Sequence, residues 1–127
     1  MKEKVSVVKD EYHQQKIPSI WRKTFEQIIE SFVNQDYNLN EAIDSVGSIS
    51  DSLASYIKEN IEEFDETLVS LPQETWDTSV CQWMESYWEV LIDLYTLESG
   101  LCDLVLSIRV YERSESYYFE VQSLHIP

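Results

Sequence analysis

Glycine, proline and cysteine are scarce in this chain of 127 residues, which holds two, three and two of them. Two glycines cannot make a phosphate-binding loop, so a nucleotide cradle and the collagen-like and low-complexity classes are excluded. Cys81 and Cys102 are too far apart for a C-x-x-C site, so we expect reduced, non-catalytic thiols in a cytoplasmic protein. No apolar run reaches the ~18 residues of a membrane span, and the charged N-terminus does not resemble a secretory signal.

Catalytic and metal-binding signatures are also missing. The sequence has no G-x-S-x-G and no H-E-x-x-H motif, and its two histidines, His13 and His125, lie near opposite ends. A dyad of His125 with Cys81 or Cys102 is formally possible, but Cys102 shares an apolar pattern with Leu104, which favours a buried, inert thiol. We therefore expect no enzyme activity, no cofactor and no metal.

Basic residues are scarce beyond residue 23. Residues 24–127 hold 21 of the 24 acids but only three of the nine bases, and the chain carries a net charge of −15. Such a body repels phosphate backbones and anionic membranes, so we expect neither as a partner. It would attract a basic protein and speed its docking. Solubility is the alternative explanation, although the charge exceeds what solubility needs.

The hydrophobic pattern predicts an α+β fold. Apolar residues recur at helical spacing over 19–35 and 50–65, which indicates two amphipathic helices. From residue 87 onward the pattern alternates between turn signals, which is typical of antiparallel strands. Residues 78–84 form either a fourth strand or an irregular crossover. We expect two N-terminal helices packed on one face of a three- to four-stranded antiparallel meander sheet.

The whole chain, 1–127, reads as a single domain that is monomeric when free. Residues 1–17 are polar and poorly periodic, which indicates a loose N-terminal arm or a short lead-in strand around Val5–Val8.

The sheet face turned away from the helices is the predicted binding surface. Alternation places acids and tyrosines there, and these residues suit a protein interface because aromatics supply contact area and carboxylates supply charge complementarity. An ordinary solvated sheet face is the alternative. The acidic face of the second helix, with Glu59, Glu62, Glu63 and Glu66, is a second candidate surface. The predicted contact residues are Glu89, Asp93, Tyr95, Asp103, Tyr111, Tyr118 and Glu120.

Several segments resemble a small bacterial family of uncharacterised function. They are Leu-Pro-Gln-Glu-Thr-Trp-Asp-Thr-Ser, Val-Leu-Ile-Asp-Leu-Tyr-Thr-Leu-Glu-Ser-Gly and Asp-Leu-Val-Leu-Ser-Ile-Arg-Val, and the likeness covers roughly residues 19–127. The size, acidity and lack of catalytic motifs also resemble the immunity proteins of bacterial toxin systems, such as contact-dependent growth inhibition. That second resemblance implies a cognate toxin domain, often a basic nuclease, whose active site is blocked.

Three functional hypotheses follow from these observations. The first is an immunity or inhibitor protein that binds a basic toxin domain. The second is a small ligand-binding or enzyme-like domain with a pocket near Trp76, Trp83 and Tyr87. The third is a stand-alone regulatory domain. Tryptophans more often anchor a small core than a ligand platform, which favours the first hypothesis over the second.

Overall fold

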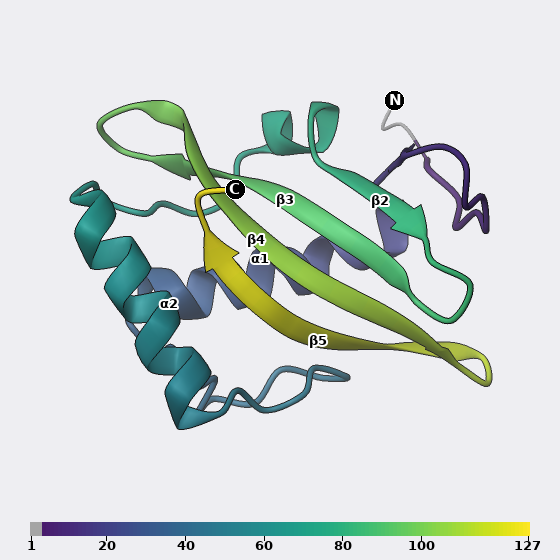
Figure 1. The fold of residues 1–127 in the computed structure, drawn as a ribbon, viewed down its shortest axis with the longest axis horizontal. Coiled ribbons are helices and arrows are strands. Elements are labelled where there is room, and N and C mark those ends of the chain that lie inside the picture. The colour runs from purple at the N-terminus through teal and green to yellow at the C-terminus, as the bar shows by residue number, and fades with distance from the viewer. Residues whose placement is uncertain (1–3) are drawn as a thin grey trace.

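The structure, a computed structural model, describes residues 4–127 and consists of two α-helices packed with an antiparallel sheet. The described part of the chain has five strands, in the order β1-β2-β3-β4-β5 along the sheet (Figure 1). Neighbouring strands are therefore also consecutive in sequence, as in a meander. The elements are β1 (Gln15–Lys16), α1 (Ser19–Val33), α2 (Asp51–Phe64), the 3₁₀ helix η1 (Gln73–Asp77), β2 (Val80–Trp83), β3 (Trp88–Thr96), β4 (Gly100–Arg113) and β5 (Ser116–His125).

The α+β class and the antiparallel sheet are confirmed, but the prediction of three to four strands was wrong. Residues 78–84 contain strand β2, and β1 adds a fifth strand by pairing Gln15 with Cys81 and Lys16 with Val80. A strand of two polar residues has no apolar alternation, so periodicity could not reveal it. The structure forms no strand at Val5–Val8.

Local sequence explains where the two helices begin and end. Helix α1 follows Pro18 and ends before Gln35, whose positive φ of 64° is incompatible with a continuing helix. Helix α2 is capped by Ser50, whose hydroxyl accepts a hydrogen bond from the Leu53 N–H. It ends at Phe64, and Asp65 caps it in the left-handed conformation typical of a helix C-terminus.

The core lies against one face of the sheet, here called the inner face, and α1 runs behind it in Figure 1. Trp21 of α1 meets the rings of Trp88 and Tyr117 edge to face, with centroids 5.2 and 5.3 Å apart. Phe25 packs on Phe119 in the same way at 5.5 Å. Buried rings in edge-to-face contact contribute roughly 0.5–1.5 kcal/mol per pair beyond their area burial. The fully buried tryptophans are therefore part of the core.

The edges of the sheet are covered by loops and side chains. On the β5 side, Gly47 N donates to Phe119 O and Phe119 N donates to Ser45 O, both at 2.9 Å, while Asn60 of α2 donates to Leu124 O at 2.8 Å. On the opposite side the N-terminal segment wraps past β2, and Gln82 Nε2 donates to Glu11 O. Covered edges resist pairing with foreign strands, so the outer face is the broad surface that the fold leaves open.

Candidate functional site: the outer face of the sheet

Strand alternation places all seven predicted contact residues on or beside the outer face. Along β3, buried positions alternate with Glu89, Asp93 and Tyr95, which are exposed or half-buried. Cross-strand pairing then brings Glu89 opposite Arg109, and Arg109 opposite Glu120 on β5. The next pair toward the β4–β5 turn joins Tyr111 to Tyr118. Asp103 is exposed and lies beside an irregularity in the β3–β4 pairing.

The structure divides these residues between two ends of the face. Near the β4–β5 turn lies a tyrosine–arginine cluster, defined as Tyr87, Arg109, Tyr111, Arg113 and Tyr118. The ring of Tyr111 stands between those of Tyr87 and Tyr118, with centroids 5.8 and 6.4 Å away. The guanidinium of Arg109 lies 4.4 Å from the Tyr87 ring, and that of Arg113 lies 4.0 Å from the Tyr118 ring. Such cation–π contacts hold both arginines in defined positions.

The tyrosine–arginine cluster also changes the electrostatics of its end of the face. A hydrogen bond from Arg109 to the Tyr111 hydroxyl, with smaller effects of Tyr87 and Glu120, raises the pKa of the guanidinium above its ordinary value. Glu89 and Glu120 flank Arg109 across the strands, so positive and negative charges alternate there. This end is consequently mixed in charge, whereas the sequence predicts a face dominated by acids and tyrosines.

The other end is acidic and centres on Tyr95. Desolvation is the largest cause that raises the pKa of Tyr95, followed by the nearby carboxylates of Glu74, Asp93 and Asp77. Glu74 and Asp77 come from η1 and are exposed. With Asp103 they form the acidic zone, defined as Glu74, Asp77, Asp93, Tyr95 and Asp103. Glu89 to Tyr95 spans six residues of β3, or ~20 Å at ~3.3 Å each, so the two ends are well separated.

Sequence reasoning missed the contributions of Tyr87, Arg113 and the η1 carboxylates. Arg113 lies four residues after Arg109 on the same strand, so alternation alone could have placed both on the outer face. The positions of Tyr87 and η1 depend instead on where the chain turns before β2 and β3, for which the sequence carries no periodic signal.

The pocket suggested near Trp76, Trp83 and Tyr87 is not assembled from those three residues. Trp83 packs against buried Trp88 with tilted rings, 4.5 Å between centroids, and Tyr87 packs with Arg109 on the outer face. The two side chains therefore lie on opposite sides of the sheet. Trp76 is 4% exposed and packs under the Arg22 guanidinium.

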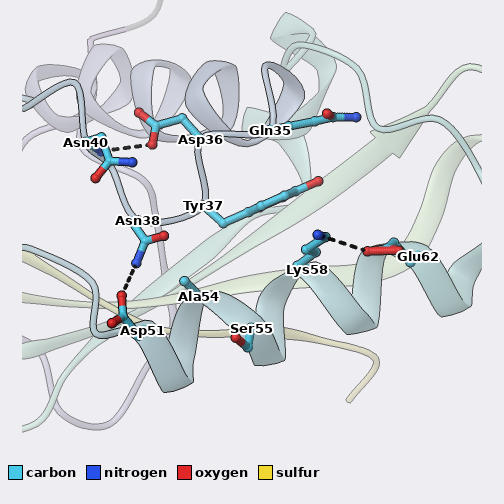
Figure 2. A pocket seen from close by; sticks show the side chains of 10 residues that line it. All are labelled: Gln35, Asp36, Tyr37, Asn38, Asn40, Asp51, Ala54, Ser55, Lys58 and Glu62. Carbon is cyan, nitrogen blue, oxygen red and sulfur yellow. Dashed lines mark hydrogen bonds and ion pairs between the residues drawn. The ribbon is translucent and has the colours of Figure 1, made fainter.

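A separate polar groove of about 650 Å³ runs between residues 35–40 and α2 (Figure 2). Several of its polar groups are engaged within the chain. Asp36 accepts from the Asn40 and Glu41 N–H groups, and Asp51 accepts from Asn38. Glu62 lies 4.0 Å from Lys58. The bonds of Asp36 and Asp51 fix the loop before α2, which gives these two acids structural roles.

The acids of the second helix do not form the continuous exposed face that the sequence predicts. Glu59, Glu62 and Glu63 are exposed, but α2 ends at Phe64 and Glu66 accepts a hydrogen bond from the Thr96 hydroxyl at 2.6 Å. Glu66 therefore ties the segment after α2 to the end of β3.

Both cysteines are free thiols in unreactive surroundings. Burial raises the pKa of Cys81 to about 11. Burial also raises the pKa of Cys102, and the carboxylates of Glu66, Asp103 and Asp93 add to the effect. The thiolate is the nucleophilic form, so a raised pKa disfavours thiol chemistry at both positions. Within residues 4–127, no group of three or more histidine, cysteine or acidic side chains is placed to hold a metal ion.

These features define an acidic α+β protein whose sheet has one open face. The chain belongs to a domain family of unknown function, DUF7668, whose model matches residues 29–127. No curated protein and no solved structure gives a significant match to it. No helix in the described part of the chain is long and apolar enough to cross a membrane.

Proposed function

We propose that this chain is an immunity or inhibitor protein that binds and neutralises a basic bacterial toxin domain in the cytoplasm. The observation that carries the proposal is the outer face of the sheet. Covered edges leave this face open, and it displays tyrosines and carboxylates on a chain of net charge −15. Its tyrosine and arginine content matches the residues that dominate binding energy at protein interfaces.

Inhibition of this kind needs no chemistry from the chain itself. A nuclease that acts on a phosphate backbone presents a cationic active site. The positive potential of that site attracts an acidic protein, which then blocks the site by occupying it. The acidic zone around Tyr95 suits the steering step because Glu74, Asp77 and Asp103 are exposed.

Co-expression with the product of the adjacent reading frame tests the proposal. We expect a neighbouring gene to encode a larger protein with a basic C-terminal domain, and that domain to co-purify with this chain as a one-to-one complex. Cells that express the domain alone should stop growing, and this chain should restore growth. An unrelated acidic protein of similar size is the control for non-specific charge attraction. A domain that is harmless alone, or whose toxicity this chain does not relieve, would contradict the proposal.

A further inference from the structure

The charge pattern of the outer face indicates more about the partner than that the partner has a net positive charge. Residues 24–127 hold only three cations, and two of them, Arg109 and Arg113, lie together in the tyrosine–arginine cluster. Lys58, the third, lies on α2 near Glu62. The outer face therefore has one end where cations and carboxylates alternate and one end that is acidic.

Arg113 is the residue of the cluster best placed to bind a partner. It is exposed at the end of β4, and its guanidinium lies over the Tyr118 ring. Stacking engages the flat face of a guanidinium and leaves the N–H groups at its edge able to donate. Within residues 4–127, no carboxylate forms an ion pair with these N–H groups. The neighbouring Arg109 differs because Glu89 and Glu120 lie directly opposite it on the adjacent strands.

Tyr118 is itself held in place from several directions. Its ring contacts Tyr111, with centroids 6.4 Å apart, and its hydroxyl lies directly against Gly47 in the loop beside β5. Arg113 therefore stacks on a rigid support. A preorganised guanidinium loses less conformational entropy on binding, which favours a two-point contact with a planar anion.

We propose that the tyrosine–arginine cluster is an anchor for a carboxylate side chain of the basic partner, with Arg113 as its main contact. This inference rests on the proposed function and makes it more specific. The acidic zone meets the cations of the partner and governs its approach. The cluster meets an acid ~20 Å away and governs dissociation, so the two zones together fix the orientation of the complex.

Charge reversal of Arg113, compared with the same reversal outside the cluster, tests this inference. Arg113→Glu and Lys58→Glu each lower the net charge by the same amount, from −15 to −17, but only the first lies in the cluster. Association and dissociation rates with the co-purified basic domain are measured by surface plasmon resonance. We expect the Arg113→Glu complex to dissociate at least tenfold faster than wild type, and the Lys58→Glu complex to dissociate at the wild-type rate.

A conservative variant separates charge from geometry. Arg113→Lys keeps the charge but loses the planar donor fork, so we expect its dissociation to be several-fold faster than that of wild type. Arg113 is exposed, and circular dichroism checks that all three variants remain folded. If Arg113→Glu dissociates no faster than Lys58→Glu, the anchor is wrong although the proposed function stands. If wild type binds no basic domain, the proposed function fails and the anchor fails with it.

Discussion

At the scale of single residues, two buried hydroxyls replace a missing strand. Beyond the start of β2, the backbone of Asp93 on β3 has no neighbouring strand on that side. Thr75 Oγ1 donates to Asp93 O at 2.6 Å, Asp93 N donates to Ser79 Oγ at 2.9 Å, and the two hydroxyls lie 2.9 Å apart. Both polar groups of a buried peptide are thereby satisfied, which avoids a desolvation cost.

Removal of the Thr75 hydroxyl should therefore destabilise the fold. Thr75→Val leaves the Asp93 carbonyl and the Ser79 hydroxyl without this partner, and we expect a loss of about 1–3 kcal/mol in the free energy of unfolding, measured in urea. Thr78→Val is the matched control because Thr78 is exposed, and its effect should stay within about 0.5 kcal/mol. Equal losses in the two variants would show that the buried hydroxyl pair contributes nothing specific.

Glu98 provides a second prediction at this scale, concerning pH. The Thr67 N–H and the Thr67 hydroxyl both donate to its carboxylate, and these bonds lower the pKa of Glu98. A lowered folded-state pKa means that the contribution to stability is present above the unfolded pKa of roughly 4.3 and is lost as the pH falls through the folded pKa. Carbon-detected NMR titration of the Glu98 carboxyl should show the lowered pKa, and Thr67→Ala should raise it again. A pKa unchanged by Thr67→Ala would rule out the hydroxyl as a cause.

At the scale of elements, the parts of the fold that could be predicted are those with a periodic residue pattern or a local capping signal. The alternation in β3 predicts which residues reach the outer face, and the hydroxyl of Ser50 marks the start of α2. The parts that depend on long-range contacts left no such signal. Strand β1 exists because it pairs with β2, whose paired residues lie 64 and 66 positions later in the chain. The tyrosine–arginine cluster exists because β3, β4 and β5 lie side by side. Periodicity reports only local burial, so it could place residues on a face but could not group them.

Gly47 connects the loop beside β5 to the tyrosine–arginine cluster. A Cβ at this position would overlap the Tyr118 hydroxyl, so Gly47→Ala should push the Tyr118 ring away from Arg113. The side-chain NMR resonances of Arg113, shifted by the ring it covers, should then move toward those of a free arginine. Gly100→Ala is the control, because Gly100 has a positive φ of 70° but no atom within 4 Å of its added Cβ. It should strain the backbone and leave the Arg113 resonances unchanged. Identical spectra for Gly47→Ala and wild type would contradict the packing.

At the scale of the whole molecule, charge is distributed unevenly in sequence and in space. The bases concentrate in residues 1–23. The N-terminal segment folds back against the acidic remainder of the chain, where Lys9 forms an ion pair with Glu112 at 2.8 Å. The remaining field is negative, and the tyrosine–arginine cluster is where the outer face presents its two arginines. Such a field accelerates association with a cationic protein, and added salt weakens it over a screening length of about 10 Å at 0.1 M.

The most direct test asks whether the outer face, and not net charge alone, receives the basic partner. Asp77→Lys/Asp103→Lys reverses two carboxylates of the acidic zone, and Glu59→Lys/Glu63→Lys reverses two on α2, so that both variants carry a net charge of −11. Association rates with the basic domain are measured at low salt and again at 1 M salt, where screening shortens to about 3 Å.

We predict that the outer-face variant associates at least tenfold more slowly than wild type at low salt, that the α2 variant slows less than threefold, and that the difference disappears at 1 M. Equal slowing of the two variants, or greater slowing of the α2 variant, would contradict the assignment of the outer face as the binding surface.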